Sequence, residues 1–253
     1  MSQVIAIAGK GGTGKTTIAS LIIRALKEAD AGSILAIDAD PNSNLGQVLG
    51  VEALSTIVGI IDDISKDPDQ IPKGTSKDRY IDMKIQESLG EEGGFDLLSM
   101  GRPEGPGCYC FANNMLRELI KKLMKNYPWV VIDNEAGMEH LSRRLVRQID
   151  TLFMVSDNSV VGVRSAARIS TLIDELKIKT GKRFLILNKS KKGPDLLKDE
   201  IKRSGLELKA ILPFDEELED AAINSRPTFE IKKDNKVLCL IRELLAESAV
   251  KKE

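Results

Sequence analysis

The chain has 253 residues, 42% of them hydrophobic, which is enough to bury a substantial core in a single domain. We therefore expect one domain over residues 1–253. The 37 Lys and Arg residues nearly balance the 38 Asp and Glu residues, and both kinds are scattered along the chain. Because this pattern produces no strong positive field, we expect neither a nucleic-acid partner nor electrostatic attachment to a membrane.

The distribution of apolar residues and cysteines predicts a cytoplasmic protein. The apolar run near the N-terminus is about six residues long, and no other run approaches the ~18 residues needed to cross a bilayer. Three cysteines in a chain of 253 residues do not form a disulfide framework. Metal binding, redox chemistry and burial remain as roles for these thiols.

Short runs rich in β-branched residues alternate with amphipathic stretches along the chain. The predicted strands are 3–8, 33–38, 95–100, 129–133, 151–156 and 183–188. The predicted helices are 15–29, 113–126, 139–148, 159–176, 194–204 and 234–248. This alternation predicts an α/β fold, a doubly wound, mostly parallel sheet with helices on both faces and a site at the carboxyl ends of the strands. Segment 60–107, rich in Pro and Gly, is expected to form loops and short elements.

The clearest motif is GKGGTGKTT, at residues 9–17, between the first predicted strand and the first helix. It fits G-x-x-x-x-G-K-[ST], in which glycines let backbone N–H groups face a phosphate chain. Lys15 is expected to contact the β- and γ-phosphates, and the Thr16 hydroxyl to ligate Mg²⁺. The predicted nucleotide-binding residues of this loop are Gly11, Gly12, Thr13, Gly14, Lys15, Thr16 and Thr17.

Lys10 is a second lysine inside this loop. With it, residues 10–16 match K-G-G-x-G-K-T, and the sequence resembles the deviant Walker A group that carries this signature. In that group the early lysine reaches the nucleotide of a facing subunit. The resemblance implies an ATP-dependent homodimer in which Lys10 acts catalytically, as an arginine finger does. A solvated loop lysine is the alternative.

Carboxylates follow two of the predicted strands. Asp38 and Asp40 lie in DADPNSN, where Asp40 can orient the attacking water while Asp38 holds Mg²⁺ indirectly or organises the loop. In VVIDNEAG, Asp133 resembles a Walker B carboxylate that acts on the Mg²⁺ shell, and Gly137 can sense the γ-phosphate through its backbone. Each carboxylate can instead cap the turn or helix that follows it.

The segment NKSK, at residues 188–191, bears on the choice of base. Guanine-binding proteins use N-K-x-D, whose carboxylate accepts hydrogen bonds from guanine, whereas this chain has Lys191 in place of that Asp. ATP is therefore favoured over GTP. We predict that Asn188 bonds the adenine edge and that the loop at Pro213 packs against the base, with an ordinary strand-to-helix turn as the alternative for that loop.

The run GPGCYC places Cys108 and Cys110 two positions apart. Gly and Pro exclude a helix before the pair, and in extended backbone residues i and i+2 point to the same side. Two such pairs in a two-fold dimer can supply four thiolates to one metal ion. Idle thiols and a redox disulfide are the alternatives. Cys239 is expected in the core, and His140 at the surface or as a cap rather than as a metal ligand.

Several segments together resemble the CooC-type carbon monoxide dehydrogenase maturation ATPases. They are the phosphate loop, DADPNSNLGQVLG, residues 100–118 and residues 133–143, so the resemblance extends over essentially the full chain. It implies an ATPase that uses ATP/ADP and Mg²⁺, forms a homodimer when nucleotide or metal is bound, and binds Ni²⁺ or Zn²⁺ through the paired cysteines. The implied client is carbon monoxide dehydrogenase or acetyl-CoA synthase. Thiolates alone would also suit an iron–sulfur cluster.

Two other functional classes fit the sequence less well. A reductase like the nitrogenase iron protein would carry a cluster cysteine just after the Walker B strand, and DNEAGMEH has none. A membrane-positioning ATPase like the cell-division site selectors would end in a basic amphipathic helix, but IRELLAESAVKKE is mixed in charge. The second class also leaves Cys108 and Cys110 without a role.

Overall fold

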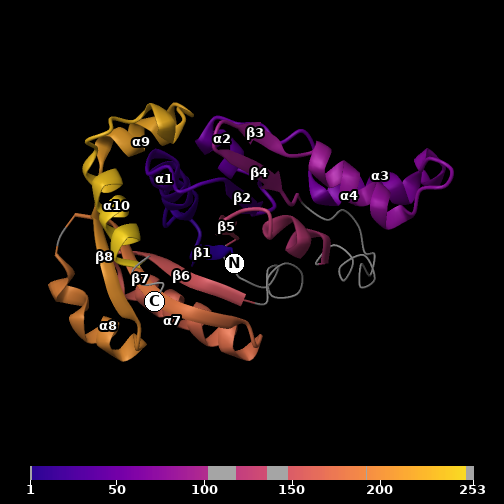
Figure 1. Cartoon of the computed structure of the whole chain (residues 1–253). Coiled ribbons are helices and arrows are strands. Elements are labelled where there is room, and N and C mark those ends of the chain that lie inside the picture. Colours follow the sequence, from indigo (N-terminus) through magenta and orange to yellow (C-terminus); the bar gives the residue numbers. More distant parts are fainter. Residues whose placement is uncertain (1, 102–117, 136–147, 192, 249–253) are drawn as a thin grey trace.

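A computed structural model describes residues 2–101, 118–135, 148–191 and 193–248 (Figure 1). Within these residues one eight-stranded sheet has the strand order β3-β4-β2-β5-β1-β6-β7-β8. The paired strands run parallel except β3 with β4. This is the mostly parallel α/β sheet that the sequence predicts.

Six of the eight strands match the predicted ones to within a few residues, and β3 and β8 had no predicted range. They are β1 (Gln3–Gly9), β2 (Ile34–Ala39), β3 (Gly90–Glu92), β4 (Phe95–Ser99), β5 (Trp129–Asn134), β6 (Gln148–Asp157), β7 (Lys179–Ser190) and β8 (Glu207–Pro213). Gln148 was predicted to end a helix, but it pairs with Lys179 at the start of β6, so that boundary was wrong. The rest of that predicted helix, 139–147, lies outside the described residues.

The helices include both predicted and unpredicted ones. They are α1 (Lys15–Glu28), α2 (Leu45–Leu49), α3 (Ile57–Lys66), α4 (Lys77–Glu87), α7 (Val160–Glu175), α8 (Lys198–Ser204), α9 (Glu216–Ile223) and α10 (Lys236–Ser248), with 3₁₀ turns η1 (Pro68–Gln70), η2 (Pro194–Leu197) and η3 (Thr228–Glu230). Residues 118–124, part of the predicted helix 113–126, are also helical. The predicted helix 194–204 is divided into η2 and α8.

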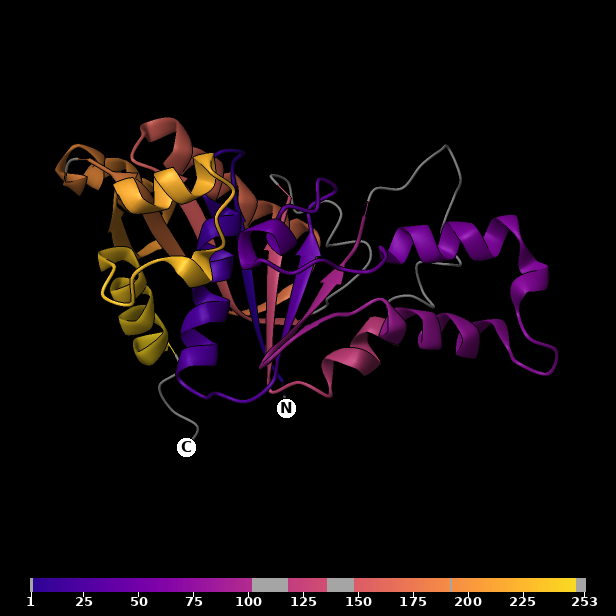
Figure 2. The same ribbon diagram turned by 90° about the horizontal axis from the view of Figure 1, so that it is seen from above.

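The prediction of loops and short elements in 60–107 was wrong for α3 and α4, which are ten and eleven residues long. The Thr56 hydroxyl accepts a hydrogen bond from Gly59 N at the start of α3, and Ser76 caps α4 in the same way. Both helices bury an apolar stripe, made of Ile57, Ile60, Ile61, Ile64, Tyr80, Ile81 and Ile85. In Figure 2 they lie side by side beyond the edge of the sheet that β3 and β4 form. The apolar residues of α3 and α4 recur at helical spacing in the sequence, but the surrounding Pro and Gly residues favoured a prediction of loops.

The central strand β1 is buried on both faces of the sheet. Its residues Val4, Ala6 and Ala8 belong to the hydrophobic layer that includes α3, α4 and α7, whereas Ile5 and Ile7 face the layer that includes α1 and α10. Burying one such isoleucine contributes ~1.5–3 kcal/mol. The carboxyl end of β1, where the glycine-rich loop begins, is therefore held by packing from both sides.

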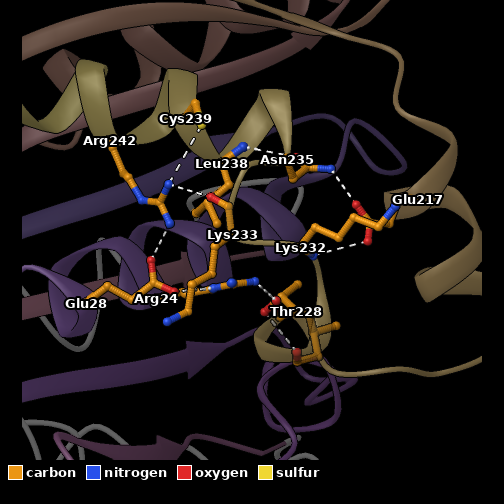
Figure 3. A network of polar contacts seen from close by, with 11 residues as sticks. Arg24, Glu28, Glu217, Thr228, Lys232, Lys233, Asn235, Leu238, Cys239 and Arg242 are labelled. Atoms are coloured by element: carbon orange, nitrogen blue, oxygen red, sulfur yellow. Dashed lines mark hydrogen bonds and ion pairs between the residues drawn. The ribbon is translucent and has the colours of Figure 1, made fainter.

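A network of ion pairs joins α1 to the C-terminal part of the chain (Figure 3). The guanidinium of Arg24, which is 1% exposed, donates from Nε to Glu28 at 2.9 Å and from Nη1 to the carbonyl of Thr228. Arg242, on α10, donates to the other oxygen of Glu28 at 2.5 Å. Because a buried guanidinium is costly unless it is paired, this network fixes η3 and α10 against α1.

We predict that Arg24→Met lowers the free energy of unfolding by about 2–4 kcal/mol, because it leaves Glu28 and the Thr228 carbonyl without their buried donor. Urea unfolding of the purified protein would measure the change. The matched control is Arg79→Met, at an exposed position of α4, which should change stability by less than ~0.5 kcal/mol. Equal effects of the two substitutions would contradict the role assigned to Arg24.

Candidate functional site

The glycine-rich loop connects β1 to α1 and requires glycine at both of its ends. Gly9 has φ +156°, and a Cβ there would lie 2.2 Å from the carbonyl oxygen of Val155 in the neighbouring strand. Gly14 has φ +91° and forms the N-cap of α1. A Cβ on Gly14 would lie 2.4 Å from Nδ2 of Asn188. Close packing therefore dictates the loop's shape, which presents the N-terminus of α1 to an anion.

Within the loop the two lysines differ in exposure. The carbonyl of Lys10 accepts hydrogen bonds from the Thr13 hydroxyl at 2.8 Å and from Nζ of Lys15 at 3.4 Å. Lys15 is 7% exposed, while Lys10 is exposed. Lys15 thus lies inside the loop, where the sequence predicts a phosphate chain, and Lys10 lies on its outer side.

Strand register brings two of the predicted carboxylates together. Asp38 of β2 is the register partner of Asp133 of β5, and Asp133 is also the partner of Ile7 in β1. Asp133 is 1% exposed, and neither of its carboxyl oxygens has a hydrogen-bond partner among the described residues. Its pKa is raised to about 7, chiefly by burial and also by the nearby charges of Asp38 and Asp40, against the lowering effects of Thr16 and Lys15. Such a buried, unsatisfied carboxylate is a candidate for binding a cation.

Asp38 and Asp40 hold the loop after β2. Burial raises the pKa of Asp38 to about 6, although its carboxylate accepts backbone hydrogen bonds from Leu45 at 2.8 Å and Asp40 at 3.1 Å. Asp40 in turn accepts from the backbone and side-chain nitrogens of Asn42, both at 2.9 Å. Of the two roles predicted for Asp38, this geometry supports organisation of the loop. Asp40 caps a turn here, and its role in orienting water stays a prediction.

Asn134 follows Asp133 at the end of β5, and the sequence analysis did not single it out. Its Nδ2 donates to the carbonyl of Ile7 at 2.8 Å, while its buried Oδ1 has no partner among the described residues. Asp133 and the Thr16 hydroxyl, which lowers the pKa of Asp133, supply hard oxygen donors, which fit Mg²⁺. Bound there, Mg²⁺ would supply positive charge that favours the ionised form of Asp133 and offsets phosphate charge. The only sign of Asn134 in the sequence was its position next to Asp133. The motif alone does not distinguish this asparagine from one at the end of an ordinary strand.

A cavity of about 300 Å³ opens beside the loop, between α1, α9 and the ends of β7 and β8. It is lined by Thr17, Ile18, Leu21, Asn188, Lys189, Pro213, Phe214, Asp215, Leu218, Glu219, Ala222, Ile223 and Val237. We call it the base pocket. Both residues that the sequence nominated for base contact, Asn188 and Pro213, lie in its wall, and its mainly apolar lining suits the faces of a planar ring.

The predicted metal site falls on residues outside the described part of the chain. Cys108, Cys110, Gly137 and His140 all lie outside the described residues. Over the ranges that the structure does describe, no group of three or more His, Cys, Asp or Glu residues could hold a metal ion. Cys239 is only partly buried and accepts a hydrogen bond from Nη1 of Arg242 at 3.8 Å, so its prediction as a core residue was wrong.

The glycine-rich loop, the buried carboxylates and the parallel sheet define a P-loop ATPase. Residues 4–228 match the CobQ/CobB/MinD/ParA nucleotide binding domain, and the chain belongs to this family. It is 41% identical over 254 residues to an uncharacterized ATP-binding protein of Methanocaldococcus jannaschii, covering 99% of this chain and 100% of that protein. It is 32% identical over 187 residues to the carbon monoxide dehydrogenase accessory protein CooC of Rhodospirillum rubrum, covering 70% of this chain and 71% of that protein.

Solved structures agree on the fold. The MinD protein of Pyrococcus horikoshii, complexed with Mg-ADP, superposes with a TM-score of 0.70 at 22% identity, covering 99% of this chain and 97% of that one. The apo McdA protein of Cyanothece gives a TM-score of 0.72 at 20% identity, covering 98% of this chain and all of the other. None of the helices in the described ranges is long and apolar enough to cross a membrane.

The raised pKa of Asp133 predicts a pH-dependent stability. Its carboxyl has a pKa of about 7 in the folded protein and an ordinary value of 3.8, so the folded state retains a proton that the unfolded chain releases. Stability is therefore lost as pH rises through this window. Without Mg²⁺ or nucleotide, Asp133→Asn should be more stable than the wild type at pH ~8 by about 1–4 kcal/mol, and equally stable near pH ~4.

Denaturant unfolding at both pH values measures this difference, and Asp69→Asn, at an exposed position in η1, is the control. A constant difference between Asp133→Asn and the wild type at both pH values would show that Asp133 ionises normally.

The fit between Gly14 and Asn188 can be tested by a double-mutant cycle. Gly14→Ala should lower the free energy of unfolding by about 1–3 kcal/mol, because the new Cβ strains the backbone and meets Asn188. Adding Asn188→Ala should recover part of this loss by removing the clash. Gly11→Ala, whose Cβ would meet nothing within 4 Å, should leave stability unchanged. Simple additivity of the first two substitutions would mean that they do not touch.

Proposed function

We propose that this ATPase is a homodimeric metal-delivery protein that assists nickel insertion into carbon monoxide dehydrogenase or acetyl-CoA synthase. The observation that carries the proposal is the pair Cys108 and Cys110, in a chain 32% identical over 187 residues to a carbon monoxide dehydrogenase accessory protein. Ni²⁺ or Zn²⁺ is the cargo, bound by the two cysteines of each subunit.

In the proposed cycle, ATP draws two subunits together, and the closed dimer completes a site of four thiolates. Lys10 reaches the partner's nucleotide, and its exposure on the outer side of the loop supports this role. Hydrolysis then reopens the dimer and releases the cargo to the client. Because the metal holds the closed form together, metal and ATP favour each other's binding.

At the nucleotide the proposed roles follow the geometry described above. Lys15 contacts the β- and γ-phosphates, Thr16 and Asp133 hold Mg²⁺, and Asp40 orients the attacking water. The other proposed contacts are Gly11, Gly12, Thr13, Gly14 and Thr17 to the phosphates, Gly137 to the γ-phosphate, and Asn188 and Pro213 to adenine. Asp38 organises the loop after β2 or holds Mg²⁺ indirectly.

A short run of backbone hydrogen bonds supports communication between the two sites. The carbonyl of Asp38 accepts from Met100 N at 2.9 Å, and the carbonyl of Met100 accepts from Val58 N at 3.1 Å. Met100 is eight residues before Cys108 in the sequence. A change in the loop after β2 on hydrolysis would therefore act directly on the strand that leads into the cysteine segment.

Membrane positioning is the main alternative, because the chain is also 26% identical over 229 residues to the septum site-determining protein MinD of Thermotoga maritima. The helix α10 argues against it. Its apolar residues Val237, Leu238, Ile241 and Leu244 are at most 3% exposed and belong to the hydrophobic layer beneath α1. A face already packed in the core is not available to lie on a lipid surface.

Light scattering combined with metal analysis tests the proposal, on protein loaded with Ni²⁺ or Zn²⁺ and then given ATP or ADP. We expect about one metal ion per dimer, lost in Cys108→Ala/Cys110→Ala but kept in the control Cys239→Ala. Lys10→Ala should bind ATP yet fail to dimerise with it. Metal retained by the double variant, or one ion per monomer without dimers, would rule out the shared thiolate site and leave a nucleotide switch.

A further inference from the structure

A second cavity, of about 660 Å³, opens at the carboxyl ends of β2 and β4, and we call it the β2–β4 pocket. In the sheet β5 separates β2 from β1, and the pocket shares no lining residue with the base pocket. Two of its lining residues, Ser43 at φ +50° and Ser225 at φ +53°, hold the left-handed conformation that serine rarely adopts. Because strained backbone of this kind gathers at ligand sites, the pocket is a candidate for binding a ligand.

The walls of the β2–β4 pocket come from two distant parts of the chain. The Thr228 hydroxyl of η3 donates to the carbonyl of Val48 in α2 at 3.2 Å, which holds the residues before η3 against α2. A Cβ on Gly50 would lie 2.8 Å from Cγ of Pro227, so the two walls touch where they meet. These contacts shape the pocket without any ligand, as is usual for sites that take small molecules.

The deep end of the pocket is polar. Asp38 and Ser99 line it and are 1% and 4% exposed. Each carboxyl oxygen of Asp38 accepts one backbone hydrogen bond, from Asp40 or Leu45, although a carboxylate oxygen can accept two. The Ser99 hydroxyl donates to the hydroxyl of Ser43 at 2.9 Å, and its own oxygen can still accept. The deep end therefore offers acceptors to a ligand that brings N–H donors.

The mouth of the pocket carries a second carboxylate, that of the exposed Glu52. Among the described residues that line the pocket there is no Lys, Arg or His, so an anion would meet two carboxylates and no cation. A bare metal ion does not fit either, because the described ranges hold no group of three or more His, Cys, Asp or Glu residues that could bind one. The charges therefore favour an organic cation.

The remaining side chains of the lining are largely apolar, among them Val51, Ala53, Leu97 and Pro227. Methylene groups that leave water for such a surface gain free energy. The described lining contains no aromatic ring on which a flat ligand could stack. An aliphatic chain with an amine at each end therefore suits the pocket, because it brings one ammonium for each carboxylate.

We propose that the β2–β4 pocket binds an aliphatic diamine, with one ammonium at Asp38 in the deep end and the other at Glu52 in the mouth. The deep ammonium donates to the carboxylate of Asp38 and to the Ser99 hydroxyl, and the methylene groups pack on Leu97. Because the Asp38 carboxylate also holds the backbone of Asp40, the ligand acts on the loop after β2. The inference depends neither on the metal-delivery role nor on the assignment of the base pocket.

The test uses three probes: putrescine, which is a four-carbon diamine, butylamine, which has the same chain with one ammonium, and the four-carbon dianion succinate. Calorimetric titration at neutral pH, without nucleotide or metal, gives the dissociation constants. Glu52→Gln removes the charge at the mouth, and Ser99→Ala removes the hydroxyl in the deep end. Glu92→Gln is the matched control, because Glu92 is exposed and pairs with Phe95 at the opposite end of β4 from Ser99.

We expect the wild type to bind putrescine about twofold to fivefold more tightly than butylamine, because only the diamine reaches Glu52. Glu52→Gln should remove this difference by weakening putrescine alone. Ser99→Ala should weaken both amines equally, by roughly threefold to tenfold, because both place an ammonium in the deep end. Glu92→Gln should bind both amines as the wild type does, and succinate should not bind.

Failure of the wild type to bind putrescine would overturn the proposal, and so would equal affinities for putrescine and butylamine. An equal loss of putrescine affinity in Glu52→Gln and Glu92→Gln would show a general attraction to acidic surface and would also overturn it. Thermal unfolding checks that each variant is folded. If Ser99→Ala is not, the comparison of Glu52→Gln with Glu92→Gln still decides. These outcomes leave the nucleotide and cysteine sites untouched, since neither ligand is present.

Discussion

The parallel pairing of β1 with β5 and β6 is the constraint on which the rest of the site depends. Its register sets Ile7 opposite Asp133 and Gly9 opposite Val155. The glycine-rich loop therefore leaves the sheet next to the buried carboxylate of Asp133. Hydrophobic layers on both faces of β1 prevent a shift of register, because a slip by one residue would exchange the residues facing each layer. The position where the glycine-rich loop begins is therefore fixed by the packing of β1, although glycine itself restricts the backbone little.

Burial raises the pKa values of the two carboxylates at the carboxyl ends of β2 and β5. Asp38 and Asp133 lie together in a region that excludes water, and both have raised pKa values because their charged forms lack solvation. Asp38 is partly compensated by two backbone N–H groups, whereas Asp133 and the amide oxygen of Asn134 are not compensated within the described residues. A cation bound beside Asp133 would offset the cost of burying its charge and would also attract the phosphates of a nucleotide.

The packing around α1 extends this organisation to the periphery. Arg24 joins it to η3, and Arg242 joins it through Glu28 to α10, while α9 and α10 also close the base pocket. A change in nucleotide position would therefore alter contacts of α9 and α10. A movement of the loop after β2 would act on Met100, whose N–H donates to the carbonyl of Asp38. Both routes are made of ordinary backbone and ion-pair contacts between neighbouring elements.

The sequence by itself determined the class of fold, the phosphate loop and the ATPase family, because GKGGTGKTT, its glycines and its flanking elements are all local features. It also nominated Asn188 and Pro213, which lie in one pocket wall. Only the tertiary structure decided that Asp38 and Asp133 are neighbours and that Lys189 reaches Gly12 from 177 residues away. It also decided that the buried amide oxygen of Asn134 has no partner within the described part of the chain. Strand order, register and burial decide these contacts, and no local pattern encodes which distant strand ends will meet.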